Sequence, residues 1–340
     1  MTGISSPPTS PPPFEPDALA RFLASTRFAP SQQHASLVLS PLVAAGAGAG
    51  EAAGTRAAEA PARYLLLDEA VARGTFGLEE LGAGGRVGRV VADNLGALPV
   101  LVLFGQELRG AKQNRVANAT FLVGARSRVE LDVSCVEQGR WAHRSRRFTP
   151  SGEVFSSAAR RKMAQSVARS MEAGAGFRAD QGAVWDDVRE RLDVSDTSSA
   201  TASYADYLGT RAPDLAEAAR AFHTVPGQVG FVAAMGGHVV GAEWMDHPAA
   251  FTASFPGLLR SYLVDTGGWD VANVLDSPVS GGPTSRTAED FLDALASCKG
   301  KAGPSLGLGE DVRFSGGGVE GCGLYDGGWV HVSAFAGAEW

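Results

Sequence analysis

The stretch FVAAMGGHVVGAEWM, residues 231–245, reads as an apolar strand, a Gly-Gly turn and a second strand. The stretch CGLYDGGWVHVSAF, residues 322–335, has the same arrangement. Both have the turn chemistry that β-hairpins favour, so we expect two antiparallel hairpins in the C-terminal third. The two stretches resemble one another weakly, and an internal repeat and two separate hairpins both stay open as explanations.

A further hairpin is expected in the first half of the chain. The segments ATFLV, residues 119–123, and VELDV, residues 129–133, are separated by GARSR. In the second segment apolar residues alternate with Glu130 and Asp132, which is typical of a half-buried strand. The pattern predicts that the two segments pair antiparallel.

The middle of the chain changes to helical periodicity. Apolar residues recur every four positions up to Met171, with Ser156 or Ser157 as the expected N-cap. A second helix is expected after Asp180, and a third from Pro213 to Phe222. Nearer the C-terminus, we expect one helix around residues 251–264 and another after residue 287, where T-A-E-D resembles a capping box.

The first 62 residues differ in composition from the rest. A Pro/Ser tail and the Gly/Ala-rich residues 46–62 predict a disordered, low-complexity region. It would hold only a short helix in DALARFLAST and a strand in SLVLSPLV. Residues 63–340 are expected to fold as three segments: β-rich 63–150, helical 151–225 and α+β 226–340. The expected class is α+β, with mainly antiparallel sheet, a helical middle segment and further helices near the C-terminus.

Composition narrows the functions to consider. The net charge of −7 and the pI near 5.4 argue against a whole-surface basic footprint for nucleic acid. Three cysteines, odd in number and far apart, fit a reducing cytoplasm better than a disulfide framework. No Cys or His pair has zinc-site spacing, so no metal site is predicted, and no particular cofactor is indicated. Without a secretory signal or an apolar run of ~20 residues, the chain is expected to be cytoplasmic and not to span a membrane.

A polar cluster follows the apolar run Val100–Phe104. It begins with GQELRGAKQNRVAN, residues 105–118, and from Glu107 to Arg147 the chain holds nine Lys or Arg residues against four Asp or Glu residues. A loop at the end of a strand can aim such side chains at a ligand. We predict ligand-binding roles here for Lys112, Gln113, Asn114 and Arg115.

A second polar stretch, VSCVEQGRWAHRSRRF, residues 133–148, leaves the neighbouring strand. Arg140 and Arg144 offer planar groups suited to phosphate or carboxylate, and Trp141 offers a stacking face for a base or sugar. Together with the first stretch they suit a phosphorylated, nucleotide-like small molecule. The structural alternative for Trp141 is a place in the core.

Three residues of these stretches are candidates for catalysis. Glu107 and Glu137 could act as general base or acid, and Cys135 is a lesser candidate as nucleophile. The structural alternative for Cys135 is that of a small buried side chain.

At these two polar stretches the sequence resembles the ARPP family, bacterial proteins named for their association with ADP-ribosylglycohydrolases and rhodanese-phosphatase proteins. The resemblance continues through ADQGAVWDDV, residues 179–188, and VVGAEWMDHP, residues 239–248, and would cover about residues 64–335. It implies a role linked to NAD or ADP-ribose metabolism, which is a hint about a ligand and not a mechanism.

Two functions are therefore expected as alternatives. The first is hydrolysis of an ADP-ribose-like or other phosphorylated nucleotide, with the polar cluster holding the phosphates. The second is a non-catalytic module that binds such a ligand, or a protein partner, through the same patch. A third, structural reading makes the cluster an internal polar network, whose loss would cost stability.

Overall fold

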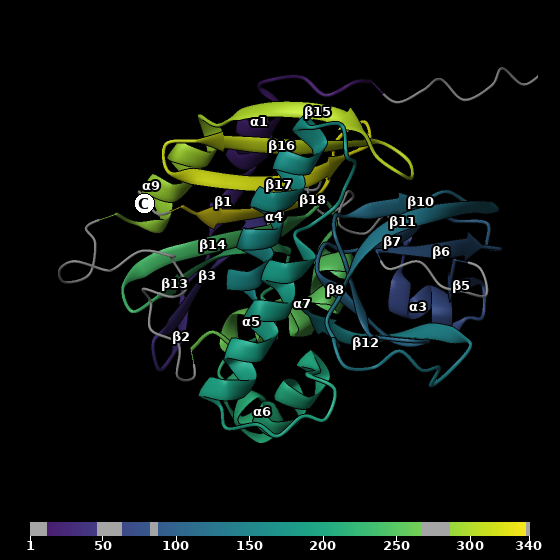
Figure 1. The fold of residues 1–340 in the computed structure, drawn as a ribbon. Coiled ribbons are helices and arrows are strands. Elements are labelled where there is room, and N and C mark those ends of the chain that lie inside the picture. The colour runs from purple at the N-terminus through teal and green to yellow at the C-terminus, as the bar shows by residue number, and fades with distance from the viewer. Residues whose placement is uncertain (1–11, 46–62, 82–87, 267–285, 338–340) are drawn as a thin grey trace, which may run out of the picture.

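The computed structural model describes residues 12–45, 63–81, 88–266 and 286–337. These residues form helices and mainly antiparallel sheets, so the predicted α+β class is confirmed (Figure 1). No helix in the described part of the chain is long and apolar enough to cross a membrane.

One nine-stranded antiparallel sheet, called here the large sheet, occupies one half of the molecule. Eight of its strands lie side by side, and β2 (Gln32–His34) pairs with β3 off this path. In spatial order the eight strands are β1 (Thr26–Phe28), β3 (Leu37–Ala44), β13 (Gln228–Met235), β14 (His238–Met245), β18 (Trp329–Ala336), β17 (Val319–Tyr325), β16 (Glu310–Gly316) and β15 (Lys299–Pro304).

A closed barrel forms the other half, seen on the right in Figure 1. Its strands are, in order around the barrel, β11 (Ser127–Cys135), β6 (Arg89–Asn94), β5 (Phe76–Glu80), β12 (Arg147–Val154), β8 (Gln106–Gly110) and β9 (Arg115–Ala117). A small sheet accompanies it, made of β10 (Phe121–Val123), β7 (Val100–Val102) and β4 (Leu65–Leu66). The barrel is not among the features that the sequence predicts.

Helices pack around and between the two halves. In Figure 1, α4 runs across the large sheet with the barrel strands to its right. The helices are α1 (Ala18–Ala24), α3 (Leu67–Ala72), α4 (Ser157–Glu172), α5 (Gln181–Val194), α6 (Tyr204–Ala219), α7 (Pro248–Leu263) and α9 (Ala288–Ala296). Along the chain, the strands β4 to β12 with α3 precede α4 to α6, and strands and helices alternate from β13 onward.

Turn and N-cap residues correctly predicted two hairpins and the starts of three helices. In the first C-terminal hairpin Met235 pairs with His238 around Gly236 and Gly237, whose φ angles of 56° and 85° suit glycine. The second C-terminal hairpin, β17 and β18, is also present. The expected caps are confirmed as well, since the side chains of Ser156, Asp180 and Thr287 accept hydrogen bonds from the first turns of α4, α5 and α9.

The hairpin expected from residues 119–133 was wrong. The strand β10 pairs with β7, while β11 pairs with β6 along one part and with β9 along another. Alternation shows which face of a strand is buried, but it does not show which strand lies beside it. Both β10 and β7 are buried along their whole length, so burial of two apolar runs determines that pairing.

The third helix also begins earlier than expected. It starts at Tyr204 and keeps Pro213 in its interior, because Tyr204, Tyr207 and Leu208 are already buried before the proline is reached. Proline marks a helix start only as a local preference, and apolar packing outweighs it here.

The expected low-complexity region is described only in part, since residues 1–11 and 46–62 lie outside the described residues. The two short elements expected there are present as α1 and β3. β3 is an internal strand of the large sheet, paired with both β1 and β13, and its Leu37, Leu39 and Leu42 are buried.

A row of polar side chains crosses one face of the large sheet. Cross-strand partners follow one another from Lys301 to Arg313, Cys322, Ser333 and Glu243. Directly opposed residues of antiparallel strands point to the same face, so these five side chains form one continuous row. The row crosses five neighbouring strands of the large sheet, from β15 to β14.

The helix α4 is fixed to this row by an ion pair. Arg160 Nη1 lies 2.7 Å from Glu243 Oε1, and both side chains are 0% exposed. Ser333 and Tyr262 donate further hydrogen bonds to the same carboxylate, at 2.6 and 3.0 Å. Arg160 also donates to Ser261 on α7 at 2.9 Å. One buried pair thus joins α4, α7 and the large sheet.

Removing one partner of this pair should destabilise the whole protein. Glu243→Ala leaves Arg160 buried without its counter-charge, which typically costs about 3–5 kcal/mol of unfolding free energy. The measurement is urea unfolding, with the exposed Glu217→Ala on α6 as a control that should change stability by less than about 0.5 kcal/mol. The double change Arg160→Met with Glu243→Leu should cost less than Glu243→Ala alone. Equal stability of Glu243→Ala and the control would contradict this role.

Candidate functional site

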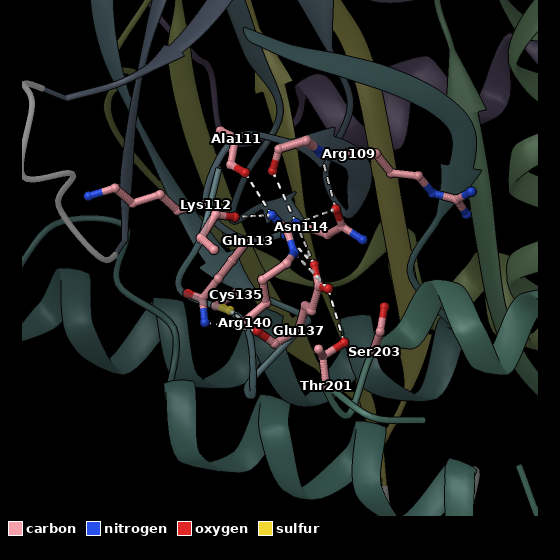
Figure 2. A network of polar contacts seen from close by, with 12 residues as sticks. Arg109, Ala111, Lys112, Gln113, Asn114, Cys135, Glu137, Arg140, Thr201 and Ser203 are labelled. Atoms are coloured by element: carbon pink, nitrogen blue, oxygen red, sulfur yellow. Dashed lines mark hydrogen bonds and ion pairs between the residues drawn. The ribbon is translucent and has the colours of Figure 1, made fainter. Parts of the chain in front are cut away.

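The polar cluster of the barrel is organised around the Glu137 carboxylate (Figure 2). Arg140 binds it through two nitrogens, at 2.8 Å to Oε1 and 2.6 Å to Oε2. The backbone N–H of Asn114 donates to Oε2 at 3.1 Å and the Thr201 hydroxyl donates to Oε1 at 3.0 Å. Burial opposes ionisation of Glu137, but the bonds from Arg140 and Asn114 outweigh it and hold its pKa below the usual value.

The guanidinium of Arg140 is fully engaged within the protein. Its Nη1 donates to the backbone oxygens of Ala111 and Ala142, at 2.7 and 2.8 Å, while Nε and Nη2 bind Glu137. Only 8% of the side chain is exposed. A phosphate would have to displace these bonds, so the geometry favours the structural reading for Arg140.

The carboxamides and Arg115 extend the same network. Gln113 donates to the backbone oxygen of Glu137 at 2.9 Å, and Asn114 Oδ1 accepts from the Gly110 N–H at 3.1 Å. Arg115 is 0% exposed, donates to Gln113 Oε1 at 3.0 Å and lies 3.7 Å from Glu80. These side chains tie the segment 110–115 to the end of β11.

Cys135 lies inside this network. Its thiol is buried and donates to the backbone oxygen of Glu137 at 3.3 Å. Burial raises its pKa, although the charge of Arg115 acts in the opposite direction. A nucleophilic cysteine needs a lowered pKa, so the environment favours the small buried side chain of the structural alternative.

Glu107 belongs to a separate set of contacts. Its Oε2 accepts from Arg109 at 2.7 Å and from Ser151 at 2.8 Å, while Oε1 has no hydrogen-bond partner among the described residues. The carboxylate is 0% exposed, and burial raises its pKa. Among the described residues, the carboxylates of Glu107 and Glu137 share no hydrogen-bond partner, and their assigned catalytic roles stay predictions.

Three of the predicted ligand-binding residues lie at the edge of the network. Trp141 is 49% exposed, with Lys112 Nζ 5.0 Å from its ring centre, so it is not the core aromatic of the alternative reading. The side chain of Lys112 points away from Glu137 in Figure 2. Arg144 is exposed and its backbone N–H donates to Ala111 at 2.9 Å. The structure therefore divides the predicted site into a buried network and an exposed margin.

A large cavity lies elsewhere, between α4 and the strands β15 to β17. Its volume is about 760 Å³, within the usual range for small-molecule sites. Four cations and two carboxylates are among the residues that line it: Arg169, Lys299, Lys301, Arg313, Glu172 and Glu320. No motif in the sequence predicted this cavity. The only available signal was the spacing of Lys299 and Lys301, which places both on one face of a strand.

Three of the four cations make no ion pair with a described residue. Arg169, Lys299 and Lys301 are exposed and make no ion pair with any described residue. The fourth, Arg313, is bound to Asp311 through Nε and Nη2, at 2.6 and 3.0 Å. Its Nη1 is buried without a hydrogen-bond partner among the described residues. With four cations against two carboxylates, the lining has an excess of positive charge that attracts an anion.

The carboxylate of Glu320 lies among these cations. It accepts a hydrogen bond from Gln165 of α4 at 2.6 Å. Burial raises its pKa, against the opposing effects of Gln165, Arg161 and Arg169. No group of three or more His, Cys, Asp or Glu side chains suited to a metal ion occurs in the described part of the chain.

The structural reading of the Glu137 network predicts a large difference between two arginines of one stretch. Arg140→Ala leaves Glu137 buried without its counter-charge and should cost about 3–5 kcal/mol of unfolding free energy. Arg144→Ala removes an exposed side chain and should change it by less than about 0.5 kcal/mol. Urea unfolding of both variants measures this difference. If Arg140→Ala lowers the free energy of unfolding by less than about 1 kcal/mol, the proposed structural role of the network is contradicted.

Ionisation of Glu137 should increase the free energy of unfolding, whereas ionisation of Glu107 should decrease it. The pKa of Glu137 is lowered on folding, so its stabilising effect is present above the unfolded value of about 4.3 and is lost as pH falls through the folded value. The pKa of Glu107 is raised on folding, so its ionisation above that folded value destabilises the protein.

Urea unfolding of Glu137→Gln and Glu107→Gln between about pH 3 and 8 tests these signs. The loss for Glu137→Gln should shrink on acidification. Glu107→Gln should gain stability relative to the wild type as pH rises. Parallel profiles for the two variants would contradict the assigned shifts.

Comparison with known proteins gives the family of the chain. Neither the curated proteins nor the solved structures contain a match to the sequence. The family model ARPP-1, described as "ARG and Rhodanese-Phosphatase-superfamily-associated Protein domain", matches residues 25–335. The match begins well before the expected residue 64 and includes β1 to β3. The resemblance seen in the two polar stretches is confirmed, and the chain belongs to the ARPP-1 family.

Proposed function

We propose that the protein binds a small phosphorylated, nucleotide-like molecule in the cavity between α4 and β15 to β17. The observation that carries the proposal is the set of unpaired cations, Arg169, Lys299 and Lys301, on its walls. The four cations of the lining outnumber its two carboxylates, and a phosphate group would reduce the repulsion among the cations.

The buried Arg313 adds a directional contact to these charges. Two of its nitrogens are fixed by Asp311, which orients the guanidinium plane. A guanidinium so oriented suits phosphate oxygens better than a flexible ammonium group does. The remaining Nη1 would gain an acceptor if a phosphate entered beside it.

The rest of the cavity suits the uncharged part of such a ligand. Ala164, Ala168 and Met171 of α4 line one wall, and Pro304 lines the wall opposite. Apolar walls with a few placed polar groups are typical of small-molecule sites. The nucleotide class is favoured by the family description, which names an association with ARG, the ADP-ribosylglycohydrolases, and with the rhodanese-phosphatase superfamily.

Hydrolysis of the ligand is the second candidate function, and Glu320 is the observation that favours it. A carboxyl group with a raised pKa, placed among phosphate-binding cations, can donate a proton to a leaving oxygen. In this proposal Glu320 takes the acid role that the sequence analysis gave to Glu107 or Glu137. Glu320→Gln would abolish turnover while leaving ligand affinity nearly intact.

Ligand-dependent thermal unfolding tests the proposed binding. ADP-ribose, ATP and inorganic phosphate would be compared on the wild type and on the double variant Lys299→Gln with Lys301→Gln. A ligand at a hundredfold over its Kd stabilises by about 2.7 kcal/mol, which raises Tm measurably. Loss of two charge-assisted contacts should weaken affinity by about tenfold or more.

The matched control is Arg27→Ala, which removes an exposed cation without an ion-pair partner on the far edge strand β1. It should keep the full Tm shift. Equal shifts in the double variant and the wild type, or no shift with any of the three ligands, would refute the proposal.

A further inference from the structure

We propose a second ligand site, in a cavity beside the barrel, for a small hydroxylated anion such as a sugar phosphate or sugar acid. This cavity has a volume of about 410 Å³. Polar side chains make up most of its lining: Arg89, Asn118, Asp132, Ser134, Arg178 and Gln181. None of its residues lines the larger cavity, so the two sites are separate.

Three distant stretches of sequence meet at this cavity. Asn118 ends the first polar stretch, Ser134 lies in the second, and Gln181 opens α5 in ADQGAVWDDV. Gln181 is held in place by the backbone of Cys135, with one bond in each direction at 2.8 Å. The start of α5 is therefore fixed against β11 at the cavity wall.

Internal hydrogen bonds hold three side chains of this lining in place: Asn118, Asp132 and Ser134. Ser134 donates to Asn118 Oδ1 at 2.7 Å, and Asn118 donates to the backbone oxygen of Phe177 at 2.8 Å. Asp132 accepts from Arg89 at 3.0 Å and from the Phe177 N–H at 3.2 Å. Asn118, Asp132 and Ser134 are each only 2% exposed.

These side chains keep unused hydrogen-bonding capacity. The Asn118 amide has a second N–H, the Ser134 oxygen can accept as well as donate, and the Asp132 carboxylate has further lone pairs. A wall that presents donors and acceptors together suits hydroxyl groups, which both donate and accept. Burial and internal hydrogen bonds fix the directions in which Asn118, Asp132 and Ser134 can donate to or accept from such a hydroxyl group.

Arg178 supplies the charge. It is exposed at the cavity and makes no hydrogen bond or ion pair with any described residue. Arg89, the other cation of this cavity, is already paired with Glu130 and Asp132. One free guanidinium beside a hydroxyl-binding wall fits a ligand that carries several hydroxyls and one anionic group. The larger cavity differs, since it combines several free cations with apolar walls.

Isothermal titration of the full chain with ribose 5-phosphate, glucuronate and ribose tests the site. Ribose 5-phosphate or glucuronate should bind, and the stronger of the two identifies phosphate or carboxylate as the anionic group. Ribose alone should bind at least about tenfold more weakly, because it lacks the contact to Arg178. Arg178→Ala should lower affinity for the anion by about tenfold or more. The exposed, unpaired Arg220→Ala on the end of α6 should leave it unchanged.

The double variant Lys299→Gln with Lys301→Gln separates this proposal from the proposed function. It should retain wild-type affinity for the sugar anion. Loss of that affinity in the double variant, with Arg178→Ala unaffected, would assign the sugar anion to the larger cavity and overturn the second site.

Chemical protection gives a second readout on the unmodified chain. Phenylglyoxal modifies exposed guanidinium groups, and mass spectrometry would follow the rate at Arg178 with and without the sugar anion. Slower modification at Arg178, with an unchanged rate at Arg220, is the expected result. Equal rates at Arg178, or failure of both sugar anions to bind the wild type, would refute the site.

Discussion

The buried ion pair between Arg160 and Glu243 is the interaction on which the rest of the structure depends. Its desolvation cost is offset by three hydroxyl groups: Ser261 accepts a hydrogen bond from Arg160, and Ser333 and Tyr262 donate to Glu243. The pair therefore holds α4, α7 and the large sheet together. The pair also constrains the barrel, because a Cβ at Gly105 would lie 2.4 Å from Arg160 Cδ, and Gly105 has a φ of 77°. Both the positive φ and the close approach of Arg160 on α4 therefore favour glycine at position 105.

Much of the secondary structure follows from local signals, whereas the arrangement of the strands does not. Turn glycines and N-cap side chains act within a few residues, so the hairpins at residues 231–245 and 322–335 and the starts of three helices were predictable. The partners of β10 and β11, the closed barrel and the start of α6 depend on contacts between distant segments. No short window of sequence contains those contacts.

The same limit applies to the sites. Arg140 and Trp141 are adjacent in the sequence, yet one is bound inside a network and the other is 49% exposed. A run of charges shows that a segment is polar but not which side chains find partners on folding. The cations of the larger cavity come from α4, β15 and β16, so only the fold brings Arg169 near Lys301. Arg169, Lys299 and Lys301 matter because they make no ion pair with a described residue, and the sequence does not show which cations form ion pairs.

The position of β15 at the end of the large sheet has a consequence for solubility. The order of the described strands ends there, so β15 presents an outer edge of backbone groups that could pair with another copy of the chain. Lysines and prolines on an edge strand discourage such pairing, and β15 carries Lys299, Lys301 and Pro304. The charges proposed to attract a ligand would therefore also keep neighbouring molecules apart, and apolar substitutions on this strand would favour aggregation.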